Sequence, residues 1–380
     1  MSGGEAAEVK EEVLRALEAL KVASKGIETN PGAFADESSR RTSPFANALL
    51  ALHTAAGDLL SGDPRLSTLS LLLSRLQSLA SSCPPSSLRR RRSVRREISH
   101  LAASIASEIE SWIHRESLDR LVSLLLSPSP PAADKEGLLR LLLSLESRLS
   151  HGFDFGLQDA ILRSGALPAV EAALVSPSSP EPLRDRCAVA LLALVRFNKD
   201  VFVGKVMAGP AIGCLVAMGS AASLRALAGL IVAIRSPLID VLLADGEILK
   251  IVAYLASPDL DVRVNALDCV LGIAYYGRKE AVDGMMEAGA VERLMDLQRP
   301  ELAGGWGGGM EKGSFGVFEG RPFVGAVARL AVGVEVGEGL RQREKRGFKL
   351  ELLRRAREAA ADEAEAATVA GEILWGTTSW

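Results

Sequence analysis

The densest charged feature of this 380-residue chain is the run Arg89, Arg90, Arg91 and Arg92, with Arg95 and Arg96 close behind. Arginine binds carboxylates and phosphates through paired hydrogen bonds, so such a run can bind an acidic partner or act as a nuclear import signal. Charge runs also commonly stay solvated in linkers. A helical pattern begins at Val94, and the helix macrodipole disfavours positive charge at a helix start. The sequence therefore leaves a solvated linker and a targeting segment both open.

Residue types that could support catalysis or bind metal form no recognisable pattern. The four histidines share no spacing with cysteines or carboxylates that would place two ligands on one helix face, so no metal site is predicted. The glycine-rich stretch 304–309 lacks the Lys-Ser/Thr pair of a phosphate-binding loop, and the Gly-x-Ser-x-Gly nucleophile motif is absent. We therefore expect neither an enzyme nor a cofactor.

Composition and charge narrow the class of protein further. Aromatic residues make up only 4% of the chain and the net charge is −3, so no overall field favours nucleic acid. The four widely spaced cysteines are typical of reduced thiols, and the acidic N-terminus does not resemble a signal peptide. The uncharged stretch 206–224 approaches the length of a membrane span, but its glycines and proline favour buried helices. These features predict a cytoplasmic protein without a membrane span, with the nucleus as a second location.

Four glycines mark an internal repeat. Gly165, Gly209, Gly246 and Gly289 each precede an apolar helical pattern, and their separations are 44, 37 and 43 residues. Periods of about 40 to 47 residues are typical of helical arrays in which each unit buries its apolar face against its neighbours. The sequence therefore predicts stacked helical units.

The repeats resemble the armadillo family. The pattern is carried by Gly165-Ala166-Leu167-Pro168, by the turn Ser257-Pro258-Asp259 and by the small-residue helix Ala266 to Ile273. The resemblance covers about residues 159–299 and extends to plant armadillo proteins related to the U-box ligase group. No U-box signature is present, since the only Cys-Pro pair, Cys83-Pro84, lies in a Ser/Pro-rich segment.

That resemblance implies an all-α, armadillo-type right-handed helical solenoid with an N-terminal helical bundle. It also implies a non-enzymatic scaffold that binds proteins on its concave face. The alternative is a degenerate or substrate-binding relative of a U-box ubiquitin ligase whose catalytic parts are supplied in trans.

The helical patterns and their breaks suggest a domain organisation. We expect an N-terminal helical region over 1–115, with helices near 5–25, 44–60, 65–80 and from Val94, and a basic linker over 81–97. Armadillo-like units follow over 116–299, starting near residues 116, 165, 209, 246 and 289. A flexible Gly-rich insertion is predicted over 300–320, and capping helices over 321–380. The last helix, 340–370, either caps the array, with Trp375 and Trp380 packed on it, or is a free amphipathic helix.

In armadillo arrays the third helix of each unit lines the concave face, and this implies a candidate site. Aligning Cys187, Ala226 and Ala266 makes two rows of polar side chains equivalent. We expect these rows to bind an extended acidic or phosphorylated protein segment, although long charged side chains also simply solvate helix faces. The family's backbone-clamping asparagine is missing at the matching positions Ala193, Val232 and Gly272. The predicted rows are Arg186, Arg225 and Asn265, and Arg196, Arg235 and Tyr275.

Overall fold

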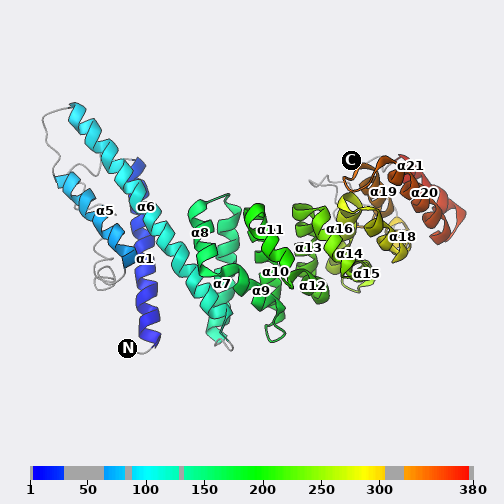
Figure 1. Cartoon of the computed structure of the whole chain (residues 1–380), viewed down its shortest axis with the longest axis horizontal. Coiled ribbons are helices and arrows are strands. Elements are labelled where there is room, and N and C mark those ends of the chain that lie inside the picture. The colour runs from blue at the N-terminus through cyan, green and yellow to red at the C-terminus, as the bar shows by residue number, and fades with distance from the viewer. Residues whose placement is uncertain (1–2, 30–63, 82–87, 128–131, 304–320, 376–380) are drawn as a thin grey trace. The chain divides into compact units, whose positions relative to one another are not determined.

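The computed structural model describes residues 3–29, 64–81, 88–127, 132–303 and 321–375, and every regular element within these ranges is a helix (Figure 1). The chain forms two compact units. The first comprises Met1–Ser123 with Asp154–Ala166, and the second Leu124–Phe153 with Leu167–Trp380. The all-α prediction is confirmed.

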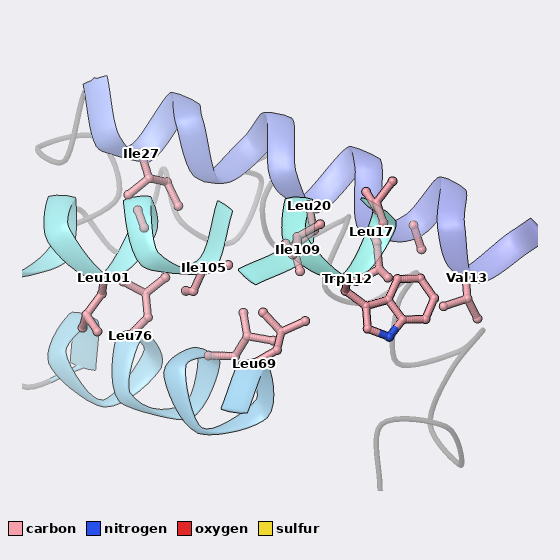
Figure 2. Close-up of a cluster of buried hydrophobic side chains, with 14 of the residues drawn as sticks. Val13, Leu17, Leu20, Ile27, Leu69, Leu76, Leu101, Ile105, Ile109 and Trp112 are labelled. Carbon is pink, nitrogen blue, oxygen red and sulfur yellow. The ribbon is translucent and has the colours of Figure 1, made fainter. Parts of the chain in front are cut away.

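The first unit contains a bundle of three helices around one apolar core. They are α1 (Gly3–Thr29), α5 (Pro64–Ser81) and α6 (Leu88–Leu125). Figure 2 shows their apolar side chains meeting between the helices. Burying each such leucine or isoleucine contributes about 1.5–3 kcal/mol, so this shared core holds the bundle together. The expected N-terminal bundle is confirmed, while the helix predicted over 44–60 lies outside the described residues. The core includes Val13, Leu17, Leu20, Leu69, Leu76, Ile98, Ile105, Ile109 and Trp112.

Helix α6 runs without a break across two predicted boundaries. The expected basic linker 81–97 is helical from Leu88 onward, and the expected boundary at 115/116 falls inside the same helix. No glycine or proline interrupts residues 88–125, and the apolar pattern continues through Leu118 and Leu121, which are both buried. A long uninterrupted helix follows because nothing in the sequence ends it. The first unit also contains α8 (Phe155–Ser164), where the Asp154 carboxylate caps the first turn.

The second unit is built from repeated helix groups. The third helices of successive groups pack side by side in chain order, α7 on α10, α10 on α13, α13 on α16 and α16 on α19. This order is that of an armadillo-type solenoid, which confirms the fold predicted from the repeat. The helices are α7 (Ala132–Ser150), α9 (Ala166–Val175), α10 (Glu181–Phe197), α11 (Lys199–Ala208), α12 (Ala211–Met218), α13 (Ala221–Ile234), α14 (Ser236–Ala244), α15 (Glu247–Ala253) with the short η1 (Tyr254–Ala256), α16 (Leu260–Tyr276), α17 (Lys279–Glu287), α18 (Ala290–Ala303) and α19 (Ala326–Val336).

The four repeat glycines each lie between two helices, but for two different reasons. Gly165, Gly246 and Gly289 have left-handed backbones, with φ of 70°, 69° and 80°, which glycine adopts without steric cost. Gly209 instead has an extended backbone, and a side chain there would collide with the carboxylate of Glu171. The repeat signal in the sequence therefore reflects both turn geometry and close packing.

Glycines also allow the third helices to approach one another closely. A Cβ atom at Gly229 would lie 2.6 Å from Leu192 on the preceding third helix, and one at Gly272 would lie 2.8 Å from Ile231. Gly333 faces Ala274 of the preceding third helix in ordinary contact. Each of these glycines points toward the preceding helix, so these positions belong to the packing between helices.

The C-terminal region differs from its prediction in two ways. Helix α19 was expected to be a capping helix, but it packs on α16 and α18 as the third helix of the last repeat. The expected single helix over 340–370 is two helices, α20 (Gln342–Ala359) and α21 (Glu363–Trp375), which pack on α19 and on each other.

Helices α20 and α21 follow the last repeat and pack on α19, and α20 also packs on α18. Phe348, Leu352 and Ala356 of α20 are buried. Leu350 and Trp375 are not part of this core, because they are 69% and 86% exposed. Residues 304–320 and Trp380 lie outside the described residues.

The apolar stretch 206–224 is divided among α11, α12 and α13. No single described helix is long and apolar enough to cross a membrane; α11 and α12 satisfy that test only as a pair bent by 73°. Their apolar side chains Phe202, Val206 and Leu215 are fully buried within the protein.

Candidate binding face on the third helices

The third helices α10, α13, α16 and α19 share a row of side chains that no other helix of the second unit covers within the described ranges. On each helix these residues are three or four positions apart, which places them on one face. We call this set the third-helix face. It comprises Arg186, Val189, Ala193 and Arg196 of α10, Arg225, Ala228 and Val232 of α13, Asp268, Leu271 and Tyr275 of α16, and Arg329, Val332 and Val336 of α19, all exposed or half-buried.

Arg186 already has an intramolecular partner. Its guanidinium lies 3.4 Å from a carboxylate oxygen of Glu146 on α7. Burial raises the pKa of Glu146 above its ordinary value, and the positive charge of Arg186 opposes this by a smaller amount. The other carboxylate oxygen of Glu146 is buried without a hydrogen bond within the described structure. Arg186 therefore compensates a buried acid and is less available to a partner.

Arg196 and Arg225 are the two predicted arginines that remain available. Both side chains are exposed, and neither forms a salt bridge with any residue in the described ranges. The Arg196 guanidinium approaches the position above Gly229 on α13, so it reaches across from one third helix to the next. These two arginines can bind a carboxylate or phosphate of a partner without breaking an ion pair within the described ranges.

Asp268 and Arg329 add a charged pair that the sequence analysis missed. Surrounding protein raises the pKa of Asp268, although its side chain reaches solvent, and the positive charges of Arg329 and Arg225 oppose that rise. Desolvation in turn lowers the pKa of Arg329, and Asp268 opposes this. A charged residue inside the otherwise apolar stretch 323–334 was the signal that could have identified Arg329.

Arg235 connects three parts of the repeat array instead of facing a partner. Its guanidinium lies 3.0 Å from Glu338, which follows α19, and 5.6 Å from the centre of the Tyr276 ring. The neighbouring Ser236 hydroxyl donates a hydrogen bond to the Tyr276 carbonyl at 2.6 Å. Arg235 is thus part of an internal contact at the ends of the third helices.

The other two predicted residues also have internal roles. Asn265 is buried, and its side-chain amide donates a hydrogen bond of 2.7 Å to the Asp261 carbonyl of its own helix. Tyr275 is half-buried, packs edge-on against Tyr276, and its carbonyl accepts a hydrogen bond from the backbone of Glu338. The predicted rows therefore do not form one continuous polar surface, because only Arg225 in the first row and Arg196 in the second are exposed without a salt bridge in the described ranges.

An apolar strip runs between the charged residues of the third-helix face. Val232 is 55% exposed and Val336 is 58% exposed, while Leu271 and Val332 are half-buried. The positions aligned with the family asparagine are not equivalent here, since Val232 is exposed and Gly272 packs against Ile231. The face thus combines an apolar strip with arginines, which fits a segment that has both apolar and acidic side chains.

The arginine run lies at the start of α6 in the first unit. The first turn of this helix contains no acidic residue that would compensate the positive charge. Arg92, Arg95 and Arg96 are exposed, and the side chains of Arg89, Arg90 and Arg91 lie outside the description. The run belongs to the first compact unit, whereas the third-helix face belongs to the second.

Possible metal ligands do not gather within the described ranges, and two of the cysteines are buried. No cluster of three or more histidine, cysteine or acidic residues is placed there to hold a metal ion. Burial raises the pKa of the Cys187 thiol to about 12 and also raises that of Cys269, so both thiols stay protonated. These buried cysteines are packing residues.

Comparisons with known proteins give structural similarity alone. No protein-family model matches the chain, and no match is found among curated protein sequences. The designed armadillo repeat protein YIII(Dq)4CqI is 19% identical, with 68% of this chain and 99% of that chain covered and a TM-score of 0.45. A designed armadillo repeat protein in complex with the peptide (KR)4 is 20% identical over 68% of this chain and 98% of its own, with a TM-score of 0.45.

An engineered protein is 18% identical over 97% of this chain and 90% of its own, with a TM-score of 0.48. Because all three TM-scores are below 0.5, the fold assignment depends on the repeat and on the packing order of the third helices described above. The chain is similar to these proteins in its helical array.

Proposed function

We propose that the chain is a non-enzymatic protein-interaction scaffold that binds an extended segment along its third-helix face. The single observation that carries this proposal is the row of exposed and half-buried charged and apolar side chains that continues over four consecutively packed third helices. Arg196 and Arg225 supply positive charge without an ion pair in the described structure, and Val232 of α13 supplies exposed apolar surface on the same face. An extended chain that passes over several helices can contact all of these groups at once.

The chemistry of the face selects the partner class. Arginine side chains form paired, charge-assisted hydrogen bonds with carboxylates and phosphates, and these are stronger than neutral hydrogen bonds. Asp268 between Arg225 and Arg329 disfavours a uniformly acidic segment, because it would repel a carboxylate placed directly above it. The best ligand is therefore a segment in which acidic or phosphorylated residues alternate with apolar ones.

Selection from a random-peptide display library tests this proposal directly. The purified full chain should enrich peptides with alternating acidic and apolar residues. The double variant Arg225→Glu and Val232→Glu should bind those peptides at least about tenfold more weakly, because it reverses one charge and places another on the apolar strip. The control Lys205→Glu reverses the charge of one exposed lysine of α11, a helix that contributes no residue to the third-helix face, and should retain binding.

Two outcomes would overturn the proposal. One is the absence of any enriched sequence class, and the other is equal binding by the face variant and by the wild type. Capture of bound proteins from cell extract distinguishes a scaffold from the alternative, a relative of a U-box ubiquitin ligase. Recovery of ubiquitin-conjugating enzymes through the same face would favour the ligase-related role instead.

A further inference from the structure

A serine lies directly after the arginine run, in the first two turns of α6. Ser93 is exposed, follows arginines at all four preceding positions, and precedes the apolar Val94. Protein kinases that select basic substrates use acidic subsites for arginines two and three residues before the acceptor serine, and charge patterns of this kind set kinase specificity. We propose that Ser93 is a phosphorylation site for an arginine-directed serine kinase.

Within the described residues, two further serines have an arginine three residues before them and an aliphatic residue directly after them, and these make the structural argument specific. Ser78 has Arg75 three residues before it and Leu79 after it, and Ser123 has Arg120 and Leu124 in the same positions. Both serines are exposed on helices, like Ser93. Sequence and exposure alone therefore leave three candidates in the described part of the chain, while Ser43, which follows Arg40 and Arg41, lies outside it.

The helical context separates Ser93 from the other two. A kinase binds its substrate segment in extended form, so the helix around the serine must open. Among the described side chains of α6, Ile98 is the first that is fully buried. Val94, directly after Ser93, is only partly buried against the core of the bundle. Opening the first turns of α6 therefore exposes little of the core.

The same opening at Ser78 or Ser123 removes core side chains. Leu76, two residues before Ser78, has no exposed surface, and Leu121, two residues before Ser123, is 1% exposed. The hydroxyls of both serines also donate hydrogen bonds within their helices, at 2.8 Å to the Arg75 carbonyl and 3.1 Å to the Arg120 carbonyl. These two sites are held closed by the packing of the bundle.

Charge at the start of α6 lowers the cost of opening further. The positive end of the helix macrodipole lies there, and the first turn contains no acidic residue. Arginines three and four positions apart, such as Arg92 with Arg95 and Arg96, repel one another on the helix. Both effects disappear when the turn unwinds.

The chemical step is an ordinary phosphoryl transfer. The Oγ atom of Ser93 forms a bond to the γ-phosphorus of Mg-ATP while the bond from that phosphorus to the bridging oxygen of ADP breaks. The hydroxyl proton passes to the kinase base, and ADP leaves. The added group carries about −1.5 to −2 charges at neutral pH and so offsets part of the arginine run.

The test is phosphorylation of the folded full chain by the catalytic subunit of a cyclic-AMP-dependent kinase with Mg-ATP, followed by mass spectrometry of each serine. We expect Ser93 to be modified at least about tenfold faster than Ser78 or Ser123. The Arg90→Ala and Arg91→Ala double variant should lose at least about tenfold in rate at Ser93, whereas Arg120→Ala should not change it. Ser93→Ala should remove the main phosphopeptide.

Three results would overturn the inference. They are no phosphate on Ser93 in the folded chain, equal rates at Ser93 and Ser123, or an unchanged rate after loss of Arg90 and Arg91. Misfolding does not confound the comparison, because alanine favours helix more than arginine does and circular dichroism reports the helix content of each variant.

Discussion

Arg235 has a backbone conformation that its side chain disfavours, and this makes a sharp prediction about stability. Its φ is 69° and its ψ is −140°, and among the described residues it is the only non-glycine with positive φ. Such a conformation costs on the order of 1–3 kcal/mol for a residue with a Cβ atom, whereas glycine adopts it freely. We therefore compare Arg235→Gly with Arg235→Ala, since both remove the guanidinium but only glycine removes the Cβ.

The magnitudes follow from the contacts of Arg235. Its ion pair with Glu338 joins side chains that are 53% and 50% exposed, so it contributes at most about 1 kcal/mol. The cation–π contact with Tyr276, at 5.6 Å, contributes about 0.5–1 kcal/mol. Alanine should therefore destabilise the protein by about 0.5–2 kcal/mol. Glycine loses the same contacts but relieves the backbone strain. Its greater freedom in the unfolded chain reduces that gain in stability by about 0.4–1 kcal/mol.

The expected result is that Arg235→Gly is about 0.5–2 kcal/mol more stable than Arg235→Ala in a urea titration. The control is the same pair of substitutions at Arg225, inside α13, where glycine should be about 1 kcal/mol less stable than alanine. If glycine were no more stable than alanine at position 235, the residue would not be strained and the reasoning would be refuted.

Three further perturbations test other parts of the account. Leu267→Ala should lower the free energy of unfolding by about 2–5 kcal/mol in the same titration, because Leu267 is 1% exposed. Leu271→Ala should lower it less, because Leu271 is only half-buried. Equal losses for the two variants would contradict the packing described here. Glu146→Gln should stabilise the protein at neutral pH, since the folded state raises the pKa of Glu146 above 4.5 and the wild type loses stability as the pH rises through that folded pKa. The advantage should vanish below about pH 4, where the carboxyl is protonated in both states, and a gain independent of pH in thermal unfolding would contradict this cause. Changing Arg89–Arg92 to alanine should move a fluorescent fusion from the nucleus to the cytoplasm if the run directs nuclear import, and an unchanged distribution would support the solvated-run alternative.

Local sequence signals were sufficient for the repeat architecture. The positive φ at Gly165, Gly246 and Gly289 requires glycine, and the spacing of those glycines therefore records where one helix turns into the next. The third helices could be aligned because each has small residues where it packs on its neighbour. The arginine run predicts a linker over 81–97, but no helix-breaking residue follows it, and α6 is therefore continuous from Leu88 to Leu125.

The candidate site was only partly predictable, because whether an arginine is free to bind a partner depends on its contacts with residues far away in the sequence. Arg235 is separated by 103 residues from Glu338, and no period in the sequence connects them. Arg186 has its partner on α7, outside the range where the repeat pattern was clear. The exposed Val232 is likewise visible only once the packing of α13 is known. Equivalent positions in a repeat share a backbone but not their partners, so alignment identified Arg196 and Arg225 without distinguishing them from the paired arginines.

Photocrosslinking from Val232 tests most directly whether the third-helix face binds an extended segment. A photoreactive p-benzoylphenylalanine in place of Val232, and a control in place of Lys205 on α11, are each irradiated with the peptide selected from the display library. The account predicts a peptide adduct from position 232, lost on addition of unlabelled peptide, and none from position 205. An adduct of equal yield at position 205, or none at position 232 while the peptide still binds, would contradict it.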